Sequence, residues 1–173
     1  MFRLIERVLS DEEIGKLVKG IALTPNITGY SFWEWKRMGK VWVAEDENGK
    51  IMGVCLCHVF GREGCILDVL FVFEEFRGLG VGKGLFEHLV KVASFSQRFV
   101  YTASREQVVI RMMEKMDFLL FDTLFRLPES YRQYEWALAW YHFRWIMSIY
   151  RMREIFRKQK VYNCNEPFIY GIM

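Results

Sequence analysis

The stretch Arg77-Gly78-Leu79-Gly80-Val81-Gly82-Lys83-Gly84 decides how this sequence folds. It follows the apolar run Ile66–Phe73 and precedes an amphipathic run from Leu85 to about Ser94, which predicts the order strand, glycine turn, helix. Glycines let the backbone curl tightly and let a ligand approach without a Cβ clash. The N–H groups that open the helix would point at one spot, where the helix dipole favours an anion. The stretch therefore predicts phosphate or pyrophosphate binding by the main chain.

Three glycine-loop patterns compete for this stretch. A Walker A loop needs a Gly five residues before Gly82 and a Ser or Thr after Lys83, but those places hold Arg77 and Gly84. The dinucleotide fingerprint Gly-x-Gly-x-x-Gly also fails, whether it is started at Gly78 or at Gly80. The third pattern, Arg/Gln-x-x-Gly-x-Gly/Ala, is matched in full by Arg77, Gly80 and Gly82.

At these residues the chain resembles the GNAT superfamily of N-acetyltransferases, whose signature for the coenzyme A pyrophosphate is this third pattern. The residues before it, Val72–Phe76, are similar to the strand end and short turn of that family. The competing interpretation is a glycine-rich turn without a ligand, but four glycines at alternate positions would then cost backbone entropy for no gain.

Length and composition limit the alternatives. At 173 residues with 52% apolar side chains, we expect one folded domain over residues 1–173. The net charge of +3 is too small to argue for a nucleic-acid partner. The N-terminal sequence lacks the long apolar segment of a signal peptide, and no run is long enough to span a membrane, so we expect a cytoplasmic protein.

The cysteines are then expected to be reduced thiols. They are Cys55, Cys57, Cys65 and Cys164. Cys55 and Cys57 would share one face of a strand, but they offer too few ligands for zinc, and we expect packed thiols and no metal.

The pattern along the chain alternates between strands and helices. Ser10 with Glu13, three residues on, predicts a capped helix that stops at Gly20, and Ser31 predicts a short one that ends at Gly39. Asn48-Gly49 predicts a hairpin turn. We expect strands over 2–8, 41–44, 51–60, 66–73, 99–102 and 118–127, a last strand over 167–173, and further helices over 85–94 and 106–116. This order resembles the GNAT fold over residues 2–127: an α/β fold with a mixed, mostly antiparallel sheet, splayed strands and flanking helices.

The resemblance implies how the cofactor would bind and react. Acetyl-CoA would lie in the wedge between the strand before the loop and the strand after the loop helix. Its pyrophosphate would sit on the loop, and its pantetheine would run along the preceding strand. A main-chain N–H near Leu70 would stabilise the oxyanion while a primary amine attacks the thioester directly. The implied cofactor-binding residues are Leu70, Phe71, Val72, Arg77, Gly78, Leu79, Gly80, Val81, Gly82 and Lys83.

Asp68 is the candidate catalytic base. It is the one carboxylate in the otherwise apolar run Ile66–Phe73, and a buried carboxylate has a raised pKa that suits proton abstraction near neutrality. It also lies near where some family members carry a basic carboxylate. The alternative is a structural Asp that pairs with an Arg or caps a bulge. Glu34 and Glu45 are weaker candidates, expected at the solvated surface.

The helix over 106–116 departs from the family pattern. Glu114, Lys115 and Phe118 match, but Met113 occupies the place of the Tyr that commonly protonates the leaving thiolate. Met has no proton to give. Tyr101 or Tyr141 would be the substitutes, although nothing in the sequence places either hydroxyl near the sulfur. This departure leaves open a second interpretation, a non-catalytic acyl-CoA-binding module.

A second departure is the segment 129–160, where the family usually has a short loop. It is expected to form one long helical insertion, apolar nearly all round in its first half and therefore buried on several sides. It also concentrates the positive charge of the chain. Three interpretations stay open: a packed helix or homodimer seam over 131–156, a lid on the acceptor cleft, or a basic face for RNA, a membrane surface or an acidic partner. The identity of the amine acceptor is not encoded in any motif.

Overall fold

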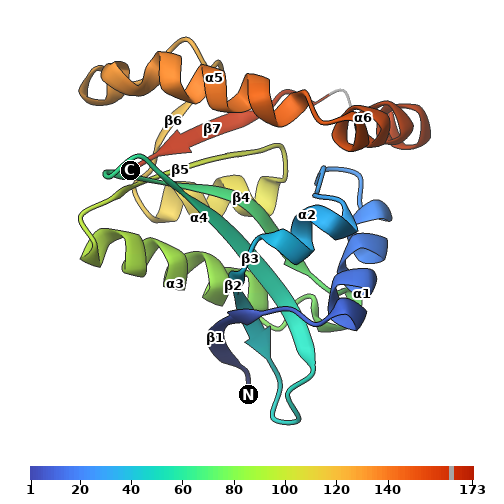
Figure 1. Ribbon diagram of the computed structural model, residues 1–173. Coiled ribbons are helices and arrows are strands. Elements are labelled where there is room, and N and C mark those ends of the chain that lie inside the picture. Colours follow the sequence, from blue (N-terminus) through green and yellow to red (C-terminus); the bar gives the residue numbers. More distant parts are fainter. Residues whose placement is uncertain (164–165) are drawn as a thin grey trace.

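The computed structural model describes residues 1–163 and 166–173, and its centre is a seven-stranded sheet in the order β1-β2-β3-β4-β5-β7-β6 (Figure 1). Every neighbouring pair is antiparallel except β4 and β5, which run parallel. The expected mixed, mostly antiparallel sheet is therefore confirmed. The strands are β1 Arg3–Val8, β2 Lys40–Glu45, β3 Ile51–Phe60, β4 Gly64–Val72, β5 Phe99–Ser104, β6 Leu119–Phe121 and β7 Ile169–Ile172.

Helices cover both faces of the sheet. The α3 and α4 helices share one core with the sheet, and α1 and α2 form a second core on the opposite face. The α5 and α6 helices extend across one end of the molecule, with α5 over β6 and β7 and α6 on the side of α1 and α2 (Figure 1). The helices are α1 Asp11–Ala22, α2 Phe32–Arg37, η1 Glu74–Phe76, α3 Val81–Phe95, α4 Gln107–Lys115, η2 Glu129–Tyr134, α5 Glu135–Ile146 and α6 Ile149–Tyr162.

Local sequence signals set several of these boundaries. Ser10 with Glu13, and Ser31 with Glu34, form capping boxes in which each side chain bonds the backbone of the other residue. The predicted hairpin turn joins β2 to β3, with Gly49 at a φ of +78°. These predictions are confirmed.

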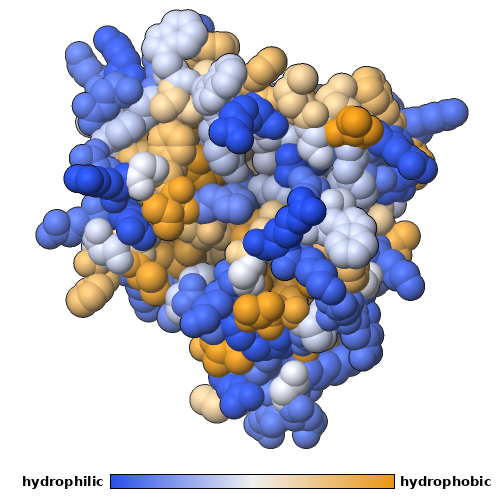
Figure 2. Space-filling model, viewed as in Figure 1, coloured by the Kyte–Doolittle hydropathy of each residue, from blue (hydrophilic) through white to orange (hydrophobic). Residues whose placement is uncertain are grey.

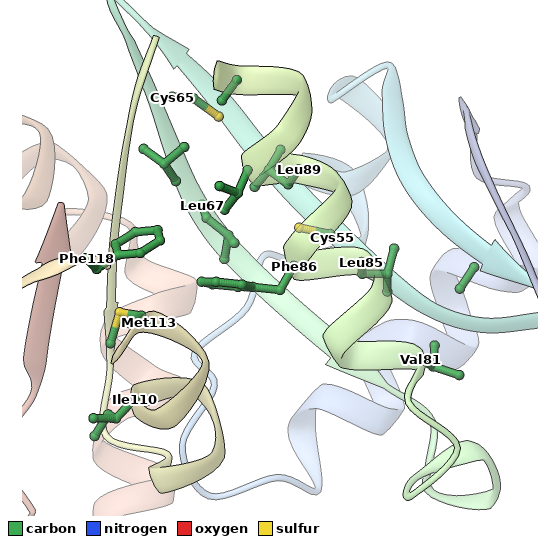
Figure 3. Packing of buried hydrophobic residues seen from close by; sticks show 14 of the residues in the cluster. Cys55, Cys65, Leu67, Val81, Leu85, Phe86, Leu89, Ile110, Met113 and Phe118 are labelled. Atoms are coloured by element: carbon green, nitrogen blue, oxygen red, sulfur yellow. The ribbon is translucent and has the colours of Figure 1, made fainter. Parts of the chain in front are cut away.

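The larger core lies between α3, α4 and the sheet (Figure 3). Leu85, Phe86 and Leu89 from α3 pack against Leu67 of β4, and Met113 and Phe118 close the cluster beside them. Because α3 presents these side chains to the sheet, its first turn and the glycine loop before it are fixed relative to β4.

The β4 and β5 strands separate halfway along their length. Their paired residues run from Gly64 opposite Phe99 to Leu67 opposite Thr102, and the Thr102 hydroxyl donates to the Leu67 carbonyl, at 3.1 Å. Beyond that point the two strands have no further paired residues, whereas β4 continues to pair with β3 as far as Val72. The expected splayed strands are thus present, and the split opens directly after Leu67.

Three sequence predictions about element boundaries are wrong. The α1 helix continues past Gly20 to Ala22. Gly20 therefore lies inside the helix and serves packing, since a Cβ there would lie 2.7 Å from the Phe71 ring. The strand expected over 118–127 is only Leu119–Phe121, and a turn closed by a bond from Arg126 N–H to the Thr123 carbonyl follows it. The insertion is not one long helix, since the extended Ser148 separates α5 from α6.

The burial predicted for the insertion is also wrong. The α5 helix contacts the rest of the chain along one side, where Leu138 is fully buried, and its other side is open. Trp136 is 81% exposed and Trp140 is 60% exposed. None of the helices in the described ranges combines the length and apolar character needed to cross a membrane.

The expectation of reduced thiols is wrong for one cysteine pair. Cys57 of β3 and Cys65 of β4 form a disulfide, with Cα atoms 6.2 Å apart, a separation typical of disulfides. The adjacent strands bring these residues together, which the spacing along the sequence did not indicate. Cys55 is a free, buried thiol, and Cys164 lies outside the described residues.

Candidate active site

The glycine loop forms a sharp turn into α3. Gly78 and Gly80 have φ angles of +79° and +78°, in the left-handed region that favours glycine, and Gly80 is the N-cap of the helix. The N–H groups in the first turn of a helix have no acceptor within that helix. Here they belong to Val81, Gly82 and Lys83. Such an arrangement of N–H groups is suited to bind a phosphate group by main chain.

The end of β4 lies against this loop. A Cβ at Gly82 would come within 3.3 Å of the Val72 side chain, and the Arg77 Nε donates to the Val72 carbonyl, at 3.4 Å. The predicted residues Leu70–Val72 therefore connect the loop to the split between the strands. Leu70 lines a cavity at the split, whereas Phe71 is buried in the opposite core beside Phe73.

Asp68 lies in a β-bulge at the split. Leu56 of β3 pairs with Val69 and Cys57 pairs with Leu67, so Asp68 is an extra residue in β4 without an opposite partner. Its side chain is 8% exposed. A bulge redirects the side chain of the extra residue, and this one lines the cavity between β4 and β5. The sequence left two interpretations of Asp68, a structural residue at a bulge and a catalytic base. The position of Asp68 in this bulge is compatible with both.

Three side chains contact one oxygen of Asp68, and two of them are tyrosine hydroxyls that donate to it. The Tyr30 hydroxyl lies 2.8 Å from Oδ2, the His58 Nε2 lies 3.1 Å from it, and the Tyr141 hydroxyl also bonds it. In the described part of the chain, Oδ1 receives none of these bonds. Burial raises the pKa of Asp68, while His58 and the two tyrosines act in the opposite direction. The result is a carboxyl group suited to accept a proton, with one oxygen held and the other available.

A second polar pair lies beside it. The Tyr101 hydroxyl and the His142 Nε2 are 2.9 Å apart, and both side chains line the cavity. Burial lowers the pKa of His142 to about 4, so its ring is neutral at neutral pH. Tyr141 and His142 both come from α5, which means that the insertion contributes directly to the site.

The cavity at the split has a volume of about 460 Å³. Its floor is formed by β4, β5 and the start of α4, one wall by the loop between α1 and α2, and its roof by α5 and α6. On the face seen in Figure 1, the surface beneath α5 is hollowed, and apolar residues gather there (Figure 2). The insertion therefore covers the cleft, as the lid interpretation expected.

Charged side chains fasten this roof. The Lys158 ammonium donates to the carbonyls of Ile21, Thr24 and Ile27, at 2.5–2.6 Å. Arg151 bonds Glu34 at 2.6 Å and stacks on the rings of Tyr30 and Trp145. The α6 helix is thereby held against the segment between α1 and α2.

Other sequence candidates lie elsewhere. Met113 is fully buried in the core beneath β7 and does not line the cavity. Glu45, expected at the solvated surface, is buried, because Arg3 and Arg7 both bond its carboxylate. Glu34 takes part in the α2 capping box and the Arg151 ion pair.

The sequence did not identify Tyr30, His58 or His142 as site residues. Each lies in a different element, and no spacing along the chain separates such residues from ordinary core side chains. Within residues 1–163 and 166–173, no three His, Cys, Asp or Glu side chains gather as a metal site would require.

Comparison with known proteins agrees with the fold described above. Residues 37–118 match the family model described as an acetyltransferase (GNAT) domain. No curated protein matches the sequence. The chain is similar in fold to Rv2747 from Mycobacterium tuberculosis, solved in complex with CoA and NLQ, with a TM-score of 0.63 at 13% identity over 98% of this chain and 99% of that one.

Two further solved structures are similar. One is N-acetylglutamate synthase from Neisseria gonorrhoeae, complexed with coenzyme A and N-acetyl-glutamate, with a TM-score of 0.62 at 14% identity. The match covers 98% of this chain but only 34% of that chain. Diaminobutyrate acetyltransferase EctA from Paenibacillus lautus, in complex with its substrate and coenzyme A, gives 0.56 at 18% identity over 70% of this chain and 81% of that one. At these identities the similarity supports the fold.

Proposed function

Because this chain is a member of the GNAT acetyltransferase superfamily, with the family domain over residues 37–118, we propose that it transfers the acetyl group of acetyl-CoA to a primary amine. The observation that carries this proposal is Asp68 at the split between β4 and β5. Its Oδ2 accepts bonds from the Tyr30 and Tyr141 hydroxyls and lies 3.1 Å from the His58 Nε2. The shared seven-stranded sheet supports treating residues 1–173 as one domain.

The glycine loop is the proposed pyrophosphate site. The N–H groups from Gly78 to Lys83 would bind it, with Arg77 adding positive charge. Pantetheine would then follow Leu70–Val72, where β4 has no partner on its β5 side. Three solved structures of similar fold, in complex with CoA, support this assignment.

Asp68 is the proposed base. Its Oδ1 would accept a proton from the incoming ammonium, and the freed nitrogen lone pair would attack the thioester carbonyl carbon. A main-chain N–H near Leu70 would donate to the oxygen that becomes negative. The nitrogen, now positively charged, loses its second proton to solvent. The carbon–sulfur bond then breaks, and the thiolate leaves with its electron pair and takes a proton from solvent. Asp68 releases its own proton to solvent before the next cycle. No covalent bond to the protein is needed.

A second function, a non-catalytic acyl-CoA-binding module, is favoured by one observation. Met113 lies buried where the family places a proton donor, so α4 provides none at that position. Tyr141 and Tyr101, which both line the cavity, are the candidate substitutes. The module would bind acetyl-CoA as tightly as the transferase but would release no thiol.

Two measurements on the purified chain test these proposals. In calorimetric titration with acetyl-CoA, the Arg77→Ala/Gly80→Ala variant should bind roughly tenfold or more weakly, because it loses a phosphate contact and strains a left-handed residue. Lys91→Ala, an exposed change in the same α3 helix, is the matched control. Unchanged binding in the double variant would exclude the loop as the cofactor site. Detection of acetylated amine by mass spectrometry would exclude the silent module.

A further inference from the structure

This inference rests on the proposed function and concerns the acceptor. We infer that the acceptor is a small primary amine carried on an apolar body of roughly aromatic-ring size, which binds beneath the α5–α6 roof with its nitrogen at Asp68. Size, wall chemistry and the fixed charges of the cavity each support this assignment.

The enclosure of the cavity limits the size of the acceptor. A volume of about 460 Å³ lies within the range of small-molecule sites, and the acetyl end of the cofactor beside Leu70 would fill part of it. The roof is fastened on two sides, since Lys158 holds α6 to three carbonyls while Tyr141 and His142 hold α5 to the strands. A small amine fits beneath the roof with all of these contacts intact.

The walls of the cavity favour an apolar body. They come from the α1–α2 loop, β4, the segment after β6, α5 and α6, so apolar side chains face the interior from several directions. The chief ones are Ile27, Ile66, Leu124, Trp145, Ile146 and Ile155. Burying an apolar group here gains affinity in proportion to the area removed from water, whereas a polyamine or amino alcohol would lose hydration without that gain.

The charges in the wall have partners already. Lys158 donates to three carbonyls, and Glu106 accepts a bond from the Asn26 amide, at 2.6 Å. Arg105 stacks on Phe168, with 4.1 Å between its guanidinium carbon and the ring centre. An acceptor that carries a carboxylate would have to pair with Arg105. An amino acid is therefore the class of acceptor that competes with an apolar amine. The Asp68 Oδ1 is then the natural partner for the ammonium of an apolar amine.

A matched set of amines tests this inference by CoA release with purified chain and acetyl-CoA. We expect kcat/KM for phenylethylamine to exceed that for ethanolamine roughly tenfold or more, since the two share the aminoethyl group and differ in the ring. Phenylalanine, which adds a carboxylate, and a lysine-containing peptide should both be poorer. A preference for ethanolamine, phenylalanine or the peptide would overturn the inference while leaving the transferase function intact.

Two tryptophan variants of α5 test where the apolar part of the amine is bound. Trp145→Ala, in the cavity, should lower kcat/KM for phenylethylamine roughly tenfold and change that for ethanolamine little. Trp140→Ala, on the open face of the same helix, is the matched control and should change neither. Unchanged acetyl-CoA affinity verifies folding in both variants. Equal losses for both amines in Trp145→Ala would contradict an apolar contact.

If no amine causes CoA release, the proposed transferase function is wrong. The inference about the apolar amine is then tested by binding of the amine alone. Phenylethylamine should then quench tryptophan fluorescence on titration in the wild-type chain, and the response should disappear in Trp145→Ala but persist in Trp140→Ala. Absence of a saturable response in the wild-type chain would overturn the inference.

Discussion

Replacement of Lys158 by methionine should loosen the roof over the cavity. Lys158 is 3% exposed, and its ammonium donates to the carbonyls of Ile21, Thr24 and Ile27 at 2.5–2.6 Å. These carbonyls lie at and after the C-terminal end of α1, where the helix dipole favours a cation. Methionine has nearly the same length but no donor, so the change removes the contacts without opening a large void.

The structure sets the size of the effect. A hydrogen bond that involves a charged group contributes about 1.5–3 kcal/mol, and a buried carbonyl left without its donor costs about 1–3 kcal/mol. The three bonds share one donor and are not independent, so we expect the free energy of unfolding to fall by about 3–5 kcal/mol in total. For a chain of this size that corresponds to a fall in Tm of about 6–20 °C.

Urea and thermal unfolding of the purified variants measure this effect. Lys160→Met, two residues further along α6 and exposed, is the matched control and should change stability by less than about 0.5 kcal/mol. Lys158→Met should also raise KM for the acceptor while leaving acetyl-CoA affinity nearly unchanged, because the glycine loop lies outside the roof. A Lys158→Met chain as stable as Lys160→Met would refute the idea that Lys158 fastens the roof.

Three further changes test other parts of the site. Asp68→Asn should lower the rate by about 10²–10⁴. The pKa of Asp68 is raised in the folded chain, so its carboxyl group stabilises the fold at acid pH, and this contribution is lost as the pH rises through the folded pKa. In urea unfolding, Asp68→Asn should therefore be more stable than the wild-type chain above that pKa. Well below pH ~4 it should show no such gain. Tyr141→Phe removes a donor that lowers the pKa of Asp68, so the acid limb of the pH–rate profile should move to higher pH; an unmoved limb would mean that Tyr141 does not act on the base. Gly53→Ala would place a Cβ 2.7 Å from the Phe71 carbonyl oxygen, and unfolding measurements should show a loss of about 1–3 kcal/mol, whereas wild-type stability would mean that β3 and β4 can separate at that point.

Short-range patterns were enough to predict the frame of the molecule. The capping boxes at Ser10 and Ser31, the Asn48-Gly49 turn and the glycine loop each act within a few residues. Asp68 could be selected because a carboxylate inside an apolar strand requires an explanation. The bulge, the two tyrosine donors and the nearby His58 provide one.

The rest of the site depends on contacts between distant segments. Tyr30, His58 and Tyr141 meet at Asp68 from a loop, a strand and a helix, and no periodicity relates them. The prediction for the insertion failed for a related reason. Apolar residues all round α5 indicate burial only if enough neighbouring structure exists, and here one side of α5 packs on the sheet while Trp136 and Trp140 stay open.

The most direct test of the account is the rate of CoA release from acetyl-CoA with and without a primary amine, measured for the wild-type chain and for Asp68→Asn. We predict release that depends on the amine in the wild-type chain and falls by about 10²–10⁴ in the variant, with acetyl-CoA affinity nearly unchanged. Release that is the same with and without amine, or the same in both chains, would contradict amine acetylation at Asp68.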